Sequence, residues 1–464
     1  MQRKLSPGLL CIVVCLGTAG CGAYHRKPIA DRQVLHDLQT IRLEALAPVQ
    51  AKPDQNAPNI DTANGLSVDE AAALALYLNP NLRAFRKERG VAEGQLVSAR
   101  LLPNPEISSS ALANLVGGGG IGSSSLAALF SPPRPGERGA RISRARAKIE
   151  EVKNQISAEE WQLAADVRKA YLTVSALEDQ LKIDDASVRL QERIRRFFLQ
   201  KRELGDASRL DLNLVNVEYA LALRQREVTS SDRGRARQAL LQLLGLPPLY
   251  DLKLKASSDS IAYRPLHLDP GILESLMIER RAQLAAAKQE YEQAEQDLRL
   301  AYIQRIPWFR VGPSWERESG KSEGTVDRLG ITLGLDLPLL NLNQGLIASL
   351  EGTRDKLRDG FTAKVHLARA ELNEAYRNLQ AQERLIRLYR DSIQRTLDEN
   401  VELTESGFQL GEFNLVQLVA TQDKVLRSRR EFVNTELEYW KAAFDLEAAI
   451  GAHLSEAESM NKQP

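Results

Sequence analysis

Two long stretches of this chain contain no proline, and they limit the possible fold more than any other feature. Residues 136–246 and 339–463 lack proline entirely and are rich in Ala, Leu, Glu, Arg and Gln. Because proline breaks a helix interior, each stretch can form continuous α-helix. We expect two helices of about 50 residues in each stretch, each about 75 Å long. Helices of this length need partner helices beside them.

A glycine divides each proline-free stretch, within "ELGDASRLDL" and "QLGEFNLVQL". Glycine commonly ends a helix because it adopts the left-handed conformation without strain. The sequence therefore predicts two tight turns between antiparallel helices. The turn residues are Leu204, Gly205 and Asp206 in the first stretch, and Leu410, Gly411 and Glu412 in the second.

Similar segments recur in the same order along the chain, which indicates an internal duplication. "AEGQL" at 92–96 is similar to "AEQDL" at 294–298, and "LGD" at the first turn is similar to "LGE" at the second. Each half is expected to read helix, strand, strand, long helix, turn, long helix, with a two-residue length difference after the turn. The matched positions are Pro105 and Pro307, Pro132 and Pro338, Lys169 and Glu374, Arg226 and Arg430, and Gly245 and Gly451.

Each half also contains a segment that predicts a β-hairpin. The expected strands are about 106–115 and 123–130 in the first half, and about 309–318 and 328–335 in the second. The second pair alternates apolar with small or polar residues, and strands near ten residues long suit a membrane-spanning barrel. Four strands cannot close a barrel, and an open sheet in lipid would leave unpaired edges. Three chains supplying twelve strands would close it.

The first residues predict a targeting segment. A basic start precedes an apolar run at 9–16 that is too short to span a bilayer, and small residues then precede Cys21. We expect residues 1–20 to be a lipoprotein signal peptide and Cys21 to be acylated, with ordinary secretory cleavage as the alternative. Cys21 would then be the only cysteine left, so no disulfide framework is expected. The further expected divisions are a periplasmic linker at 21–64, a first repeat at 65–255, a second repeat at 256–455 and a tail at 456–464.

Composition and motifs argue against several classes of function. The formal net charge is only +1, whereas nucleic-acid binders normally carry a basic excess. No two of the five histidines lie at metal-ligand spacing from each other. "GGGGIG" lacks the Lys and Ser/Thr of a phosphate loop. We therefore expect no catalytic residue, no metal site, no cofactor and no nucleic-acid partner.

The duplicated pattern, "LSVDEAAALALYLNPNLRA", "LLPNPEIS", "LPLLNLNQG" and the two turns together resemble the TolC-type outer-membrane efflux proteins over about residues 60–455. The resemblance implies a mainly α fold with a transmembrane β-barrel portion. Long antiparallel helical hairpins would form an α-barrel in the periplasm, and a homotrimer would close a 12-stranded barrel in outer-membrane lipid. The chain would be the passive exit duct for drugs or heavy-metal ions, working with a periplasmic adaptor and an inner-membrane pump of the RND class.

The resemblance also assigns roles to the two predicted turns. They would lie at the periplasmic tip, contact the adaptor and form the entrance. In some relatives, acidic residues past the second turn form a ring at the entrance, but Gln417 and Ala420 occupy those positions here. Asp206, Asp211 and Glu412 are the acidic residues that could replace it.

Two other classes of function stay open at this point. One is a periplasmic coiled-coil adaptor or structural lipoprotein of an export complex, which is disfavoured because only hairpins interrupt the helices. The other is a lipoprotein hydrolase, which is disfavoured because the sequence shows no nucleophile, base or metal cluster.

Overall fold

The computed structural model describes residues 24–40, 65–113, 122–255, 263–320, 324–410 and 412–461. The chain divides into a unit of Met1–Val49 and a unit of Gln50–Pro464. Helix α2 (Asp31–Gln39) is the helix described in the first unit, and its apolar residues Val34, Leu35 and Leu38 are all exposed. Cys21 and Gly411, for which roles were predicted, lie outside the described residues.

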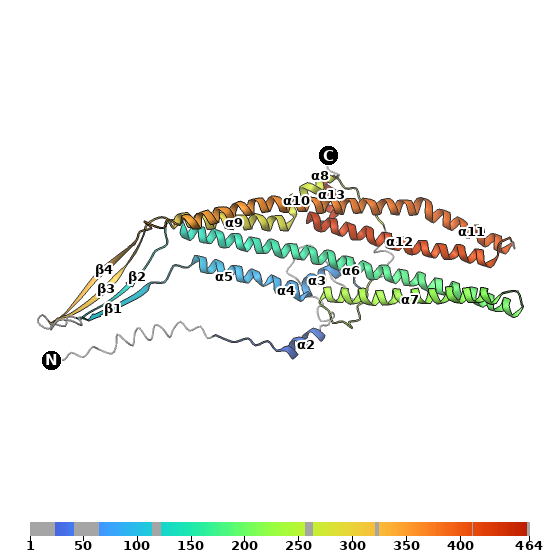
Figure 1. The fold of residues 1–464 in the computed structure, drawn as a ribbon, viewed down its shortest axis with the longest axis horizontal. Coiled ribbons are helices and arrows are strands. Elements are labelled where there is room, and N and C mark those ends of the chain that lie inside the picture. The colour runs from blue at the N-terminus through green and yellow to red at the C-terminus, as the bar shows by residue number, and fades with distance from the viewer. Residues whose placement is uncertain are drawn as a thin grey trace. The chain divides into compact units, whose positions relative to one another are not determined.

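The second unit contains two similar series of elements, each with helices, then a pair of strands, then two long helical segments (Figure 1). This order agrees with the predicted duplication, and a short helix α13 follows the second series. The first series is α3 (Val68–Leu78), α4 (Pro80–Arg86), α5 (Glu88–Arg100), β1 (Glu106–Ala113), β2 (Gly122–Leu129), α6 (Glu137–Glu203) and α7 (Arg209–Leu244). The second is α8 (Pro270–Arg280), α9 (Ala282–Ile303), β3 (Trp308–Gly320), β4 (Gly324–Asp336), α10 (Gln344–Leu388), π-helix η3 (Tyr389–Gln394), α11 (Arg395–Gln409) and α12 (Leu415–Ile450), with α13 at Leu454–Asn461.

The long helices are unequal in length, which corrects the expectation of about 50 residues each. Helix α6 has 67 residues and α7 has 36. In the second repeat, α10, η3 and α11 follow one another without a loop, and α12 again has 36 residues. The reason is that both turns lie well past the middle of the proline-free stretches. At 1.5 Å per residue, α6 is about 100 Å long.

Helices α7 and α12 are equivalent at both ends. Ser208 and Asn414 are their N-caps, Gly245 and Gly451 are left-handed C-caps, and each pair lies 206 positions apart. The expected two-residue length difference after the turn is therefore wrong, and Arg430 does not correspond to Arg226.

The hairpins and the starts of the long helices follow a different spacing. Leu129 and Asp336 end β2 and β4, and Gly136 and Asn343 are the left-handed N-caps of α6 and α10. Both pairs lie 207 positions apart. The expected match of Pro132 with Pro338 is consequently wrong by one position.

The first helix of each repeat is held to a long helix by a tyrosine. In the first repeat the Tyr171 hydroxyl donates to the carbonyl of Leu66 at 2.8 Å, just before α3. In the second, the Tyr376 hydroxyl donates to the carbonyl of Leu268 at 3.5 Å, just before α8. Ser67 caps α3 and forms a reciprocal capping box with Glu70, which a serine three residues before a glutamate favours.

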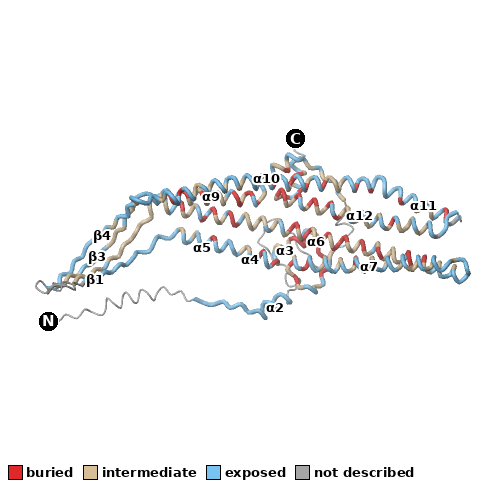
Figure 2. The backbone as a smooth tube through the Cα atoms, viewed as in Figure 1, coloured by how far each residue is buried: buried red, intermediate tan, exposed pale blue. Residues whose placement is uncertain are grey.

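Buried residues are concentrated along the middle of the helical part, and the sheet and helical tips are mostly exposed (Figure 2). One core cluster joins α8, α9, α10, α12 and α13 around Leu276, Met277, Tyr439 and Leu446. None of the helices in the described residues is both long enough and apolar enough to cross a membrane.

The strands form one antiparallel sheet in the order β1-β2-β3-β4. They lie together at one end of the helical part, and the turns after α6 and α11 lie at the other (Figure 1). Strands β1 and β4 are the two edges, so each edge of the sheet belongs to a different repeat. Both edges have unpaired backbone groups within the chain.

Candidate functional site

One face of the sheet is apolar. Opposite residues on neighbouring strands share a face, and the β3–β4 register pairs Phe309 with Leu335, Val311 with Leu333, Pro313 with Ile331 and Trp315 with Leu329. The other face carries small and polar residues at the intervening positions, including Gly330, Thr332 and Gly334. Such a two-sided sheet suits contact with lipid on one face and water on the other.

Aromatic side chains mark both ends of this apolar face. Trp308 and Phe309 lie at the helix end of β3, with ring centroids 5.0 Å apart, and Trp315 lies further along the strand. The rise from Phe309 to Trp315 is about 20 Å, close to the apolar height of about 25 Å in outer-membrane barrels. Beyond Trp315, Arg317 forms a bidentate pair with Asp327, at 2.7 and 2.9 Å.

The two predicted turns share a backbone hydrogen bond that spans six residues. In the first, Gly205 has φ 86°, and the amide of Asp206 donates to the carbonyl of Lys201 at 2.8 Å. In the second, the amide of Glu412 donates to the carbonyl of Gly407, also at 2.8 Å. In the first turn, this six-residue bond and the left-handed Gly205 form the Schellman motif that commonly ends a helix.

Asp211 has a structural contact that the sequence analysis did not assign. Its carboxylate accepts a hydrogen bond from the amide of Ser208 at 2.9 Å, and the Ser208 hydroxyl accepts from the amide of Asp211 at 3.1 Å. These bonds with Ser208 lower the pKa of Asp211 below its usual value. Asn414 and Gln417 form the same capping box before α12. Asp211 therefore caps α7, whether or not it also faces an entrance.

Asp206 and Glu412 differ from Asp211, because only their backbone groups take part in the turns. Within the described part of the chain, their exposed carboxylates have no hydrogen bond or ion pair. Leu204 and Leu410 precede the two turn glycines and are 77% and 76% exposed. Each tip thus presents one apolar and one acidic side chain to solvent.

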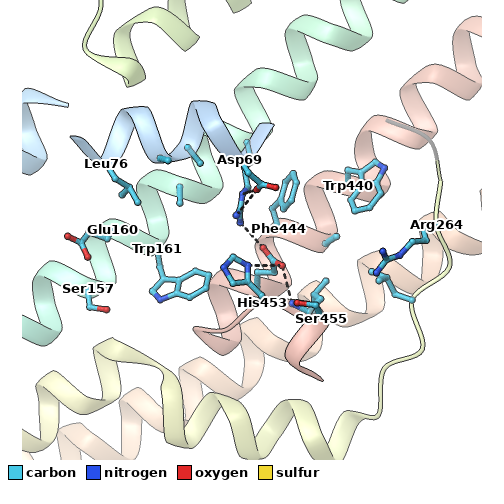
Figure 3. A pocket seen from close by; sticks show the side chains of 18 residues that line it. Asp69, Leu76, Ser157, Glu160, Trp161, Arg264, Trp440, Phe444, His453 and Ser455 are labelled. Atoms are coloured by element: carbon cyan, nitrogen blue, oxygen red, sulfur yellow. Dashed lines mark hydrogen bonds and ion pairs between the residues drawn. The ribbon is translucent and has the colours of Figure 1, made fainter. Parts of the chain in front are cut away.

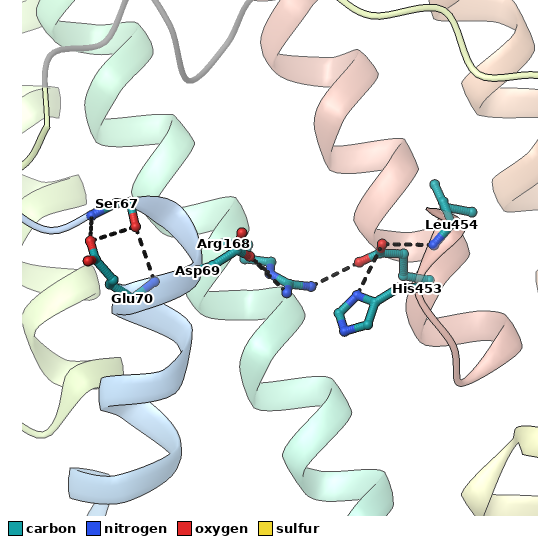
Figure 4. Close-up of polar contacts among 7 residues, drawn as sticks. Ser67, Asp69, Glu70, Arg168, His453 and Leu454 are labelled. Carbon is teal, nitrogen blue, oxygen red and sulfur yellow. Dashed lines mark hydrogen bonds and ion pairs between the residues drawn. The ribbon is translucent and has the colours of Figure 1, made fainter. Parts of the chain in front are cut away.

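A cavity of about 680 Å³ lies between α3, α6 and α12 (Figure 3). Arg168, on α6, binds Asp69 of α3 and Glu447 of α12, each at 2.9 Å (Figure 4). Glu447 also accepts from the Leu454 amide at 3.0 Å and lies 3.5 Å from His453 Nδ1. The hydrogen bond between His453 and Glu447 raises the pKa of His453 above its usual value. The charged groups lining the cavity pair with other residues of the chain, so this network joins the two repeats.

A second polar contact joins the repeats nearer the tips. Arg430 of α12 donates to Asp184 of α6 at 2.7 Å and to Thr229 of α7 at 2.9 Å, and Thr229 donates to Asp184 at 2.6 Å. Asp184 and Thr229 are almost fully buried. Sequence analysis missed both networks, because no local pattern indicates which charges on different helices will meet.

Helix α7 carries an apolar stripe that no helix in the described part of its own chain covers. Leu210, Leu214, Val217 and Leu221 follow the spacing of four, three and four residues, and about half or more of each side chain is exposed. This is the heptad spacing of helices that pack side by side. An exposed apolar stripe with this spacing indicates that another helix packs against it.

No group of three or more His, Cys, Asp or Glu residues within the described ranges is arranged to hold a metal ion.

Comparisons with known proteins agree with this architecture. Residues 273–452 match the family described as outer membrane efflux protein. The chain is 24% identical over 395 residues to the cobalt-zinc-cadmium resistance protein CzcC of Cupriavidus metallidurans, covering 84% of this chain and 91% of that protein.

Solved structures share the fold. A membrane protein from Pseudomonas aeruginosa superposes with a TM-score of 0.69 and 18% identity, covering 88% of this chain and 97% of the other. The outer-membrane channel OprN superposes with a TM-score of 0.68 and 17% identity, covering 88% and 99%.

Proposed function

We propose that the chain is a TolC-type outer membrane efflux protein, three copies of which form the exit duct for divalent heavy-metal cations. The sheets of the three copies form a 12-stranded barrel in the outer membrane. Their long helices form a tube that reaches into the periplasm. The cations move passively, because the energy is supplied by an inner-membrane pump.

The observation that carries this proposal is the two-sided sheet with its two open edges. An apolar face bounded by aromatic residues is stable in lipid only if every backbone group finds a partner. In a single chain the outer edges of β1 and β4 have no neighbouring strand within the described sheet. Pairing β4 of each copy with β1 of the next gives every edge a partner. The stripe of Leu210, Leu214 and Val217 on α7 supports the same assembly, since a neighbouring copy can cover it.

The helical tips provide the contact with a periplasmic adaptor and form the entrance. Leu204 and Leu410 supply apolar contact area to the adaptor, and their similar exposure suits a partner that meets both repeats. Asp206 and Glu412, with Asp211, form an acidic ring that raises the local cation concentration at the entrance. Asp206 and Glu412 contribute most, because Asp211 is also bonded to the cap of α7.

The cargo and the remaining partners follow from resemblance. CzcC, by its name, confers resistance to cobalt, zinc and cadmium, and this chain covers most of its length. We assign the same class of substrate to this chain and a pump of the RND class. Acylated Cys21 anchors each copy in the outer membrane after removal of residues 1–20, and the linker and the two repeats have the bounds given above.

Three measurements test the proposal: the mass of the purified assembly, its conductance in planar bilayers and the metal tolerance of a strain that lacks the gene. Purified protein is expected to be a trimer by native mass spectrometry and to form cation-selective channels in planar bilayers. Deleting the gene should lower tolerance to cobalt, zinc and cadmium several-fold, and expression of the wild-type chain should restore it. A trimer that conducts without any change in metal tolerance would refute the cargo alone. A monomer without conductance would refute the duct and favour the adaptor or structural lipoprotein.

A further inference from the structure

We infer that β4 of one copy pairs with β1 of the next copy in the same register in which β2 pairs with β3 at the junction between the two repeats. We call this contact between copies the seam. The seam pairs Gly334 of β4 with Leu112 of β1 in the next copy, and exposed leucines cover it at the helix end. This inference rests on the proposed trimer and adds the residues and register of its contact.

The junction inside the chain is the pairing of β2 with β3. It runs from Gly122 opposite Ser319 to Ala127 opposite Ser314, and an isolated bridge joins Phe130 to Val311. At the helix end, the indole nitrogen of Trp308 donates to the carbonyl of Pro132.

Arg134 closes the same end of this internal junction. Its Nε donates to the carbonyl of Ile306 at 3.1 Å, and its guanidinium lies 5.9 Å from the Trp308 ring centroid. The boundary between the repeats is therefore paired along the strands and covered at the end where they meet the helices.

The duplication gives the equivalent positions at the outer edges. In the two hairpins, Glu106 pairs with Leu129 and Trp308 pairs with Asp336. Strand β1 thus corresponds to β3 with a difference of 202, and β2 corresponds to β4 with a difference of 207. In the internal junction Ala127 of β2 lies opposite Ser314 of β3. The position equivalent to Ala127 in β4 is Gly334, and the position equivalent to Ser314 in β1 is Leu112. Gly334 therefore lies opposite Leu112 of the next copy.

This register keeps the apolar face continuous around the assembly. It places Leu333 opposite Ala113 and Leu335 opposite Ala111 of the next copy, on the face that carries Trp315. A slip by one residue would place these apolar side chains opposite water-facing ones. The face pattern, which was not used to obtain the register, therefore supports it.

The two outer flanks carry the exposed apolar residues that such a seam requires. By the same differences, Pro132 and Pro133 correspond to Leu339 and Leu340, and the end of α9 at Ile303 corresponds to Leu101. Leu340 is 96% exposed and Leu339 is 78% exposed within a single chain, and Leu101 and Leu102 are more than half exposed. Prolines, Arg134 and Trp308 close the internal junction, whereas leucines from two copies close the seam between them.

The register is tested by a double variant, Leu112→Cys with Gly334→Cys. Opposite residues in an antiparallel pair have Cα atoms about 4.5–5.5 Å apart, within the range of about 4.4–6.8 Å for a disulfide. A Cβ at Gly334 meets nothing closer than 3.7 Å, so the cysteine fits. Oxidation in isolated outer membranes should yield a covalent trimer on non-reducing gels.

The matched control is Leu112→Cys with Thr332→Cys, which is two residues off on the same face of β4. It should cross-link at least about tenfold more slowly, because its Cα atoms lie beyond disulfide range. A trimer in which the Thr332 pair reacts faster, or neither pair reacts, would overturn the register and leave the trimeric duct standing. Absence of any trimer in native mass spectra would instead refute the proposed function.

The apolar part of the seam has a separate measurement. A bimane label on a Leu340→Cys variant should be shielded from nitroxide-labelled lipids in reconstituted trimers, and a label on Ile331→Cys should be quenched by them. Quenching of both labels to the same extent would show that lipid, and not a second copy, covers Leu340.

Discussion

The guanidinium of Arg430 on α12 and the carboxylate of Asp184 on α6 form an ion pair at 2.7 Å, with the carboxylate almost fully buried. The two residues come from different repeats, so the link ties the second helical hairpin to the first. The hydroxyl of Thr229 on α7 donates to Asp184 and accepts from Arg430, so both charged groups have a further hydrogen bond inside the protein.

Arg430→Met should destabilise the helical part strongly. Removing one partner of a buried ion pair leaves an unpaired charge and costs about 3–5 kcal/mol. Arg226→Met is the matched control, because Arg226 binds Asp185 at 2.7 Å while both side chains are more than one-third exposed. Loss of this exposed ion pair should lower stability much less, because exposed pairs contribute little. Thermal unfolding in detergent, followed by helical circular dichroism, measures the stability loss of each variant. Equal losses would contradict the conclusion that the buried Arg430–Asp184 pair contributes more than the exposed Arg226–Asp185 pair.

Ile331→Lys should impair insertion of the sheet, whereas Thr332→Lys should be tolerated. The two neighbours lie on opposite faces of β4, and Ile331 belongs to the face that we assign to lipid. A lysine facing the bilayer midplane costs about 2–4 kcal/mol, and one facing the lumen costs little. The yield of folded protein in outer membranes measures the difference. Tolerance of Ile331→Lys together with loss of Thr332→Lys would reverse the two faces.

The tip carboxylates should affect ion passage, and Asp211 should mainly affect stability. Asp206→Asn with Glu412→Gln removes exposed, unpaired charges and should reduce cation selectivity in planar bilayers several-fold without lowering the unfolding temperature. Asp211→Ala should lower the unfolding temperature slightly, because it removes a capping-box partner. An unchanged selectivity in the double variant would remove the acidic ring from the proposal.

Deleting one residue from the π-helix should be tolerated better than the same deletion in α6. A π-helix contains one residue more than the α-helix that would replace it. Deleting Ser392 from η3 can therefore restore regular helix and leave the packing on both sides in place. Deleting Ser187 from uninterrupted α6 rotates all following residues by about 100° relative to their partners. Folded yield and trimer content compare the two; equal damage would show that η3 does not absorb the extra residue.

His453 should contribute stability only at lower pH. Its pKa is raised in the folded state, chiefly by the hydrogen bond with Glu447, with Asp69 adding to the shift and Arg168 opposing it. A raised pKa stabilises the fold fully below the unfolded value of about 6.5, and the contribution is lost as pH rises through the folded value. Because His453 is half-exposed, the effect should stay below about 1 kcal/mol.

The measurement compares the wild-type chain with His453→Gln from pH 5.5 to 8.5. The difference in unfolding temperature should be largest at pH 5.5 and should vanish at high pH. His366→Gln, at an exposed position of α10, is the control variant. A difference that grows with pH would contradict the assigned hydrogen bond.

The sequence predicts most of the architecture, because its strongest signals are local and repeated. Proline-free stretches, Gly205, the capping box of Ser67 and the alternation in β3 and β4 all report on residues close to one another in the chain. The errors fall where similar sequences can be aligned in more than one way. Pro132 was matched one position away from its equivalent, and Arg226 was matched to a residue that its helix ends do not support.

The polar networks between repeats could not be predicted in the same way. Arg168 and Glu447 are separated by 279 positions, and Arg430 and Asp184 by 246. Each is one of many charged residues on long helices, and only the packing of those helices selects the pairs. The π-helix was missed because its residues have no composition that distinguishes them from ordinary helix.

The uninterrupted course of α6 from the sheet to the tip has a mechanical consequence. No loop lies along its length to absorb a rotation, so the helix acts as a lever about 100 Å long. A tilt of only about 5° where it leaves the sheet moves its far end sideways by about 9 Å. A slight tilt of α6 at its sheet end would therefore displace the helical tip by about the width of a helix.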